Sequence, residues 1–306
     1  MPGVDGPTRP LGLDERTAAP PSRRLGNGSG GDEPGGTRGH TGNGRPPPWV
    51  KVGVVLLVVV LAFWGIHGLV SGGHTRAAIT PACAVSTAGG RFIMTPEQAA
   101  NAATIAAVGH RLGLPDHAVT IALATALQES RLINLPSGDR DSVGLFQQRP
   151  SEGWGTPREL RNPVYTSTAF YHALTRLPGW ESLAVTRAAQ DVQHSAAPEA
   201  YAAQEAEARS LAIALTGEVP AGLACHFSPS AIPVTARWSA ALTAELGSVR
   251  PGTAVSSATG WVLAGWLTAH AQELGFTTVS FGGQTWTPTA GVWRVGGASD
   301  GVVHVT

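Results

Sequence analysis

The sequence contains little charge, and the charge that it contains is balanced. Only 14% of its 306 residues are Asp, Glu, Lys or Arg, and 21 basic residues offset 21 acidic ones, so the formal net charge is zero. This balance excludes a nucleic-acid-binding protein that relies on a globally basic surface. With 42% apolar residues, the chain as a whole is also not a highly charged disordered protein.

Cysteine is scarce, and several catalytic motifs are missing. Cys83 and Cys225 are the only two cysteines, too few for a four-cysteine zinc site or a disulfide-dense scaffold. The sequence has no HExxH pair, no Walker A loop, no spaced-glycine dinucleotide fingerprint and no nucleophile elbow. We therefore expect neither a metal nor a cofactor.

The composition changes abruptly near residue 49. Residues 1–48 hold 12 Gly and 9 Pro with few large apolar residues, which predicts a disordered tail. Residues 52–70 contain no Asp, Glu, Lys or Arg, and a helix of that length nearly matches a hydrocarbon core of ~30 Å. We predict one transmembrane helix over 49–71, retained as an anchor because a cleaved signal peptide starts nearer the N-terminus.

Basic residues predict the orientation of this helix. The bases just before the apolar segment are Arg38, Arg45 and Lys51, whereas Arg76 is the one base between it and Arg91. The positive-inside rule places the N-terminus in the cytoplasm and residues 72–306 outside. In an oxidising compartment we expect Cys83 and Cys225 to form a disulfide, the alternative being two free thiols.

The exported part is predicted to contain a mainly helical domain over 95–227, after a linker over 72–94. Thr95, Pro96 and Gln98 fit the N-cap, first and third positions of a capped helix. A second apolar helix begins near Asp116, and the later helices are expected over 163–177, 182–195 and 198–216. The polar segment 134–162 is long enough to be functional.

The C-terminal part is predicted to be a small α+β module over 259–306, after a linker over 228–258. Residues 259–274 are expected to form a helix. The sequence TTVSFGGQTWTP alternates around a Gly-Gly pair and so predicts a hairpin. The runs VWRV and VVHVT are expected to add two strands.

Glu129 stands in the last turn of the second predicted helix. The negative end of the helix dipole and the apolar neighbours both disfavour an ionised carboxylate there. A glutamic acid that stays protonated suits a general acid. On position alone, an ordinary surface glutamate is the alternative.

A two-part motif surrounds this glutamate. Glu129 and Ser130 close the helix, and after a polar loop Gly144 to Gln147 read Gly-Leu-Phe-Gln. Over about residues 96–217 this arrangement resembles the lytic transglycosylases of the soluble-type, lysozyme-like superfamily. The resemblance implies that Glu129 is the single acid/base, that Ser130 lies beside it, and that Gly144 and Gln147 shape the sugar groove.

The resemblance also implies a partner and a reaction. Peptidoglycan glycan strands would be cleaved between N-acetylmuramic acid and N-acetylglucosamine, with the acid protonating the glycosidic oxygen. The same carboxylate would then take the proton of the muramyl 6-hydroxyl and close a 1,6-anhydro ring. A lysozyme-type hydrolase would instead use a second carboxylate, for which Asp139 and Asp141 are candidates.

The sequence departs from the family at one point. Val192 and Gln193 stand where many members carry Tyr-Asn, and Tyr201 or Gln193 is expected to replace the missing tyrosine. The run VQHSAAPEAY, with QQRPSEGWGT upstream, resembles a variant of actinobacterial cell-wall proteins. The aromatic candidates for stacking on sugars are Trp154, which is favoured by its place in the loop, Tyr165, Tyr171 and Trp180.

The C-terminal module weakly resembles exported zinc D-alanyl-D-alanine carboxypeptidase-like domains. His304 matches one ligand, but Val302 replaces another, and residues 228–258 supply no upstream ligands. A lone histidine cannot hold a catalytic zinc ion, so we expect a non-catalytic module that binds wall peptide or packs on the first domain. A wall-binding or secretion scaffold without turnover is therefore a further alternative for the whole chain.

Overall fold

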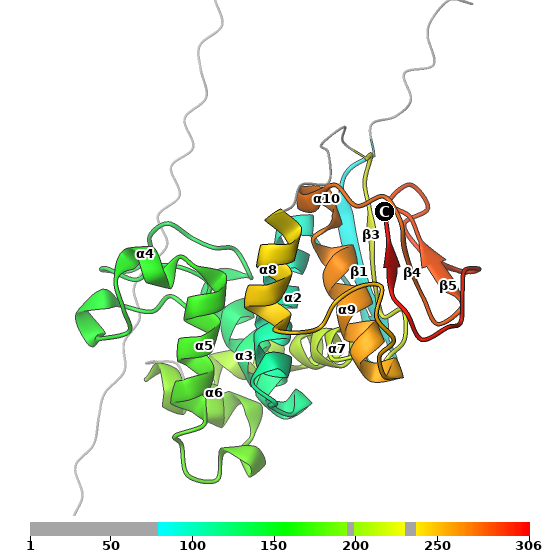
Figure 1. The fold of residues 1–306 in the computed structure, drawn as a ribbon. Coiled ribbons are helices and arrows are strands. Elements are labelled where there is room, and N and C mark those ends of the chain that lie inside the picture. Colours follow the sequence, from blue (N-terminus) through cyan, green and yellow to red (C-terminus); the bar gives the residue numbers. More distant parts are fainter. Residues whose placement is uncertain (1–78, 195–198, 230–236) are drawn as a thin grey trace, which may run out of the picture. The chain divides into compact units, whose positions relative to one another are not determined.

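The computed structural model describes residues 79–194, 199–229 and 237–306, a mainly helical arrangement with two small antiparallel sheets (Figure 1). The predicted tail over 1–48 and the predicted membrane helix over 49–71 lie outside these residues. Within the described ranges, no helix is both long enough and apolar enough to cross a membrane.

Two consecutive helices form the centre of the helical part. Helix α2 (Pro96–Arg111) begins with the predicted capping box, in which the Thr95 and Gln98 side chains each accept the other's backbone N–H. Helix α3 (Asp116–Ser130) is buried continuously from Ala118 to Leu127. Its sequence permits this, because nearly all of those residues are apolar and its two threonine hydroxyls donate to carbonyls one turn earlier.

The other helices surround α3. Helices α5, α6 and α7 all contact it, together with the short turn η3. The bounds are α4 (Pro157–Leu160), α5 (Pro163–Leu174), α6 (Val185–Gln193) and α7 (Glu205–Leu215), with 3-10 turns η1 (Pro150–Glu152), η2 (Trp180–Ser182) and η3 (Ala200–Gln204). The three later helices are present where they were predicted but are shorter, and the turn η3 takes up the beginning of the third expected range.

The first sheet joins residues from the two ends of the helical part. Strands β1 (Ala82–Thr87), β2 (Gly90–Met94) and β3 (Leu223–His226) lie in the order β2-β1-β3. The segment 72–94 is therefore not the plain linker that the sequence predicted. Cys83 lies directly opposite Cys225, and the two form the expected disulfide.

The C-terminal part holds three helices and a second sheet. The helices are α8 (Arg237–Leu246), α9 (Ser257–Ala269) and α10 (Ala271–Leu274), and the strands are β4 (Val279–Phe281), β5 (Gln284–Trp286), β6 (Trp293–Val295) and β7 (His304–Val305). The predicted Gly-Gly hairpin is confirmed as β4–β5, with both glycines at positive φ. Helix α8 falls in the predicted linker 228–258 and packs on α2, so that prediction is corrected.

The C-terminal part shares its core with the helices that precede it. Helix α9 is buried from Gly260 to Ala269 and packs on α2, α7 and β3 (Figure 1). Gly260 lets β4 approach closely, since a Cβ there would lie 1.9 Å from the Phe281 ring. The indoles of Trp286 and Trp293 donate to the carbonyls of Cys225 and Leu223, at 3.0 and 2.8 Å. The second sheet is thus fastened to the disulfide-bonded strand β3.

The disulfide is expected to stabilise this shared core. Replacing Cys83 and Cys225 together by alanine should lower the free energy of unfolding by up to about 5 kcal/mol, because a cross-link over 142 residues restricts the unfolded chain. Urea unfolding of the full chain, followed by circular dichroism without reductant, would measure the loss. Reductant should shift the wild type toward the variant and leave the variant unchanged, and equal midpoints for the two oxidised proteins would contradict the prediction.

Candidate functional site

Glu129 lies where α3 leaves the core. Leu127 is buried, Gln128 is exposed and Glu129 is partly exposed. The helix stops immediately afterwards, because Arg131 and Leu132 both adopt the left-handed conformation, with φ of +56° and +60°. The end of α3 therefore presents the carboxyl group just beyond the buried stretch Ala118–Leu127.

The hydroxyl of Tyr201 contacts this carboxyl group. Its Oη donates a hydrogen bond of 2.6 Å to Glu129 Oε1. Tyr201 belongs to η3 and is 1% exposed, so its ring is held by packing and the hydroxyl approaches from a fixed direction. Of the two residues expected to replace the family's tyrosine, Tyr201 makes this contact, whereas Gln193 donates to the Phe146 carbonyl at 2.7 Å.

Ser130 connects the helix end to the Gly-Leu-Phe-Gln loop. Its buried hydroxyl lies 2.7 Å from the Leu145 carbonyl and 3.1 Å from the Ala126 carbonyl. Leu145 and Phe146 are fully buried, and the Phe146 ring stacks on Phe170. The middle of the motif is therefore a core anchor that holds the loop against the last turn of α3.

The two outer residues of the motif shape the loop itself. Gly144 has φ of +80°, and a Cβ there would lie 2.2 Å from the Leu160 carbonyl oxygen. Gln147 turns its amide inward, donating to the Gly144 carbonyl at 2.9 Å and accepting from the Ser142 hydroxyl at 3.1 Å. The amide predicted to line the sugar groove is thus hydrogen-bonded within its own loop.

The two loop aspartates differ in their surroundings. The two oxygens of Asp141 accept hydrogen bonds of 2.8 Å from the Ser151 backbone N–H and the Arg149 guanidinium. These bonds, the backbone bond first, lower the pKa of Asp141 to about 2. Asp139 is exposed and lies 3.9 Å from Arg140. Asp141 is therefore a structural residue that fixes the loop.

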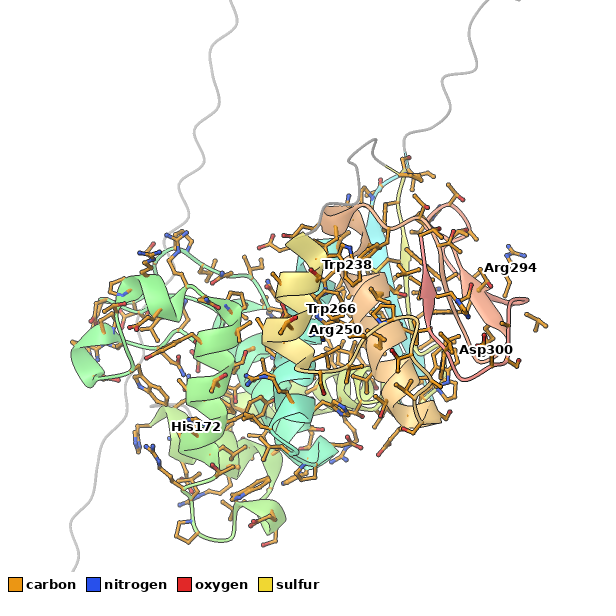
Figure 2. All side chains as sticks on the ribbon, in the orientation of Figure 1. His172, Trp238, Arg250, Trp266, Arg294 and Asp300 are labelled. Atoms are coloured by element: carbon orange, nitrogen blue, oxygen red, sulfur yellow. A yellow bond between two sulfur atoms is a disulfide. The ribbon has the colours of Figure 1, made fainter. Side chains whose placement is uncertain are left out.

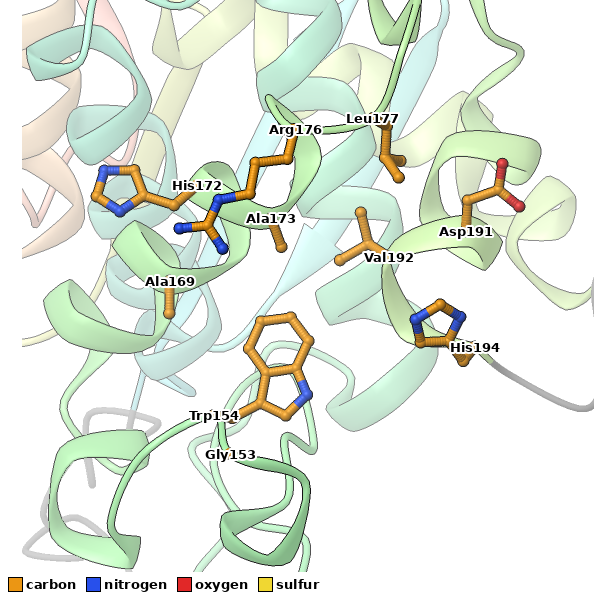
Figure 3. Close-up of a pocket in the computed structure, with 10 residues that line it drawn as sticks. All are labelled: Gly153, Trp154, Ala169, His172, Ala173, Arg176, Leu177, Asp191, Val192 and His194. Atoms are coloured by element: carbon orange, nitrogen blue, oxygen red, sulfur yellow. The ribbon is translucent and has the colours of Figure 1, made fainter.

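Trp154 extends from this loop into a pocket of about 480 Å³ between α5 and α6 (Figure 3). Figure 3 shows its indole facing Ala169 and Ala173 on one side and Val192 on the other. The other aromatic candidates do not line this pocket. Tyr165 donates to the Trp154 carbonyl at 3.2 Å, and Tyr171 and Trp180 are buried in the core.

The sequence reasoning missed Gln204, which braces the segment that carries Tyr201. Its amide donates to the Gln128 side chain at 3.2 Å and accepts from Arg131 at 3.4 Å. These contacts join η3 to both sides of Glu129. The sequence offered no signal for them, because the partners lie more than 70 residues apart.

In the C-terminal part, His304 lies 3.0 Å from Asp300 on the surface. Across the described ranges, no group of three or more His, Cys, Asp or Glu is placed to hold a metal ion. No protein-family model matches the sequence, and a search among curated proteins finds no match. The function must therefore be argued from the site.

Gly144 offers a test of the loop geometry. Gly144→Ala should destabilise the chain by about 1–3 kcal/mol more than Gly179→Ala. Both glycines have positive φ, but an added Cβ would overlap a backbone oxygen at Gly144 and meet no atom within 4 Å at Gly179. Urea unfolding of the two variants beside the wild type measures the difference. Equal losses would show that the Leu160 carbonyl does not restrict this position.

Proposed function

We propose that the chain cleaves the β-1,4 bond between N-acetylmuramic acid and N-acetylglucosamine in peptidoglycan, as a lytic transglycosylase with a lysozyme-like domain over 95–227. The observation that carries the proposal is the 2.6 Å hydrogen bond from Tyr201 to Glu129. It gives Glu129 a fixed partner at the end of the buried helix α3. It also gives Glu129 a tyrosine partner, although Val192 and Gln193 replace the Tyr-Asn pair that many members of the resembled family carry.

Glu129 would act twice in the reaction. As an acid it donates its proton to the glycosidic oxygen, and the N-acetyl group of the substrate assists the oxocarbenium-like centre. The resulting carboxylate then accepts the proton of the muramyl 6-hydroxyl, whose oxygen closes the 1,6-anhydro ring. The Tyr201 hydroxyl stabilises the carboxylate between the two steps, since hydrogen bonds to an ionised acceptor are the stronger ones.

The state of Asp141 supports this route over hydrolysis. A hydrolase needs a second carboxylate that activates water or attacks the sugar. One oxygen of Asp141 accepts from Arg149 and the other from Ser151. If Asp141 took part in the reaction, these two hydrogen bonds would break and the loop would lose its anchor. Asp139 is the remaining candidate, and its side chain is 92% exposed.

The disulfide supports a location outside the cytoplasm, because such bonds persist in oxidising compartments. With the apolar segment 52–70 as an anchor, cleavage would be confined to wall close to the membrane. Residues 1–48 would then form a cytoplasmic tail. The residues 259–306 would have no catalytic role, and the contacts of α9 with α2 and α7 would join them to the helical part.

Digestion of purified peptidoglycan by the full chain tests the reaction. Wild type should release 1,6-anhydromuramyl products detected by mass spectrometry, whereas Glu129→Gln should release none because the amide carries no transferable proton. The matched control is Glu181→Gln, which makes the same change at an exposed glutamate distant in sequence from Glu129. This variant should behave as wild type. Reducing-end products would identify a hydrolase, and folded protein without any product would favour the binding scaffold.

Tyr201 can be tested separately. Tyr201→Phe should lower kcat by about 10- to 100-fold with little change in KM, because it removes one hydrogen bond to a charged group. Tyr171→Phe is the control, since it removes a buried hydroxyl that donates to the Ile105 carbonyl and should reduce stability only. Equal kcat values for Tyr201→Phe and wild type would contradict the assigned role.

A further inference from the structure

A second cavity lies between the helical part and the C-terminal part. Its volume is about 520 Å³, and its walls come from α2, the α4–α5 turn, α8 and the region of α10. It shares no lining residue with the Trp154 pocket. The ionisable residues in its lining are Arg158, Arg161, Glu245, His270 and Glu273.

The floor of this cavity holds a buried carboxyl group. Glu245 is 7% exposed, and one oxygen accepts a 2.7 Å hydrogen bond from the Trp266 indole, which lies between α8 and α9 (Figure 2). Within the described residues this is the one hydrogen bond of that carboxyl group. A carboxylate can accept about four, and an ionised one is costly to bury without a positive partner.

The imidazole of His270 lies beside this carboxyl group. Its Nδ1 lies 3.0 Å from the Trp266 carbonyl oxygen, and because a carbonyl only accepts, Nδ1 carries the hydrogen. Its Nε2 lies 3.9 Å from Glu245 Oε2 and 3.4 Å from the Thr104 hydroxyl. Within the described residues, no Lys or Arg side chain forms an ion pair with Glu245. The lining of the cavity therefore offers this carboxyl group to a ligand with a cationic N–H donor.

The exposed part of the lining carries two guanidinium groups, those of Arg158 and Arg161, and one carboxyl group, that of Glu273. Arg158 and Arg161 are exposed, and neither forms an ion pair with any residue that the structure describes. Guanidinium groups are well suited to binding carboxylates. A cavity with a buried acid at its floor and two guanidinium groups in its walls is complementary to a ligand with both an ammonium and a carboxylate.

The cavity also adjoins the chain that follows Glu129. Asn101, in its wall, donates to the Leu132 carbonyl at 2.8 Å. Asn134 donates to the carbonyl of Arg161, another wall residue, at 2.8 Å. The segment that leaves the candidate site is thus hydrogen-bonded to two sides of the cavity.

We propose that this cavity binds the peptide stem of peptidoglycan, with the free ammonium of its diamino acid against Glu245 and a carboxylate against Arg158 and Arg161. The choice of this peptide, among ligands that carry an ammonium and a carboxylate, rests on the proposed function. It assigns the C-terminal part a role, because α8 supplies Glu245. The chain would then select glycan strands by the peptide they carry.

Calorimetric binding to the full chain tests the proposal with the peptide L-alanyl-γ-D-glutamyl-L-lysine as probe. Acetylation of the lysine amine should weaken binding at least about tenfold, because the buried carboxylate loses its charged partner. Glu245→Gln should weaken binding of the free peptide similarly and abolish the difference between the two peptides. The control Glu181→Gln should bind both peptides as wild type does.

Two results would overturn the proposal: no binding of the free peptide to wild type, or equal binding of the free and acetylated peptides. The second comparison uses wild type alone, so it stands even if Glu245→Gln does not fold. Glu129→Gln should bind the peptide normally. If wild type binds the peptide but does not cleave glycan, the proposed function is refuted and the peptide site stands. If wild type cleaves glycan but does not bind the peptide, the peptide site is refuted and the proposed function stands.

Discussion

The enclosure of α3 is the constraint on which the rest of the structure depends. A helix that is apolar on every side must be surrounded, and α2, α5, α6 and α7 satisfy that requirement. Only its two ends are polar, so Glu129 emerges at one defined place, in the last turn. The left-handed residues after it send the chain toward α2 and the α4–α5 turn. The position of the candidate site thus follows from the burial of one helix.

The site is held mainly by contacts to backbone atoms. Ser130, Gln193 and Gln147 bond to carbonyl oxygens, and Asp141 accepts from a backbone N–H. Such contacts fix the path of the loop, and within the described residues Tyr201 is the side chain that hydrogen-bonds to Glu129. The C-terminal part contributes in the same manner, since two tryptophans donate to carbonyls of β3. It is therefore an integral part of the fold.

Features with local causes were predictable from the sequence. The capping box at Thr95, the Gly-Gly hairpin and the ends of α3 depend on neighbouring residues, and the sequence located them. Tyr201 was predicted as one of two alternatives, because its spacing from Glu129 said nothing about distance in space. The strands β1 and β2, helix α8 and the inward turn of Gln147 were missed, since each depends on partners elsewhere in the chain. The second cavity could not be predicted because its walls come from four separate segments.

The position of β1 in the middle of its sheet determines when the fold can be completed. The β1–β2 hairpin can form early, but two strands alone are marginally stable. The third strand follows only after every helix from α2 to α7 has been synthesised, with its cysteine 142 residues beyond Cys83. Trp286 and Trp293 cover β3 later still. The fold therefore has a late, long-range closing step, which favours slow folding and leaves strand edges exposed to aggregation in any chain that stops before β6.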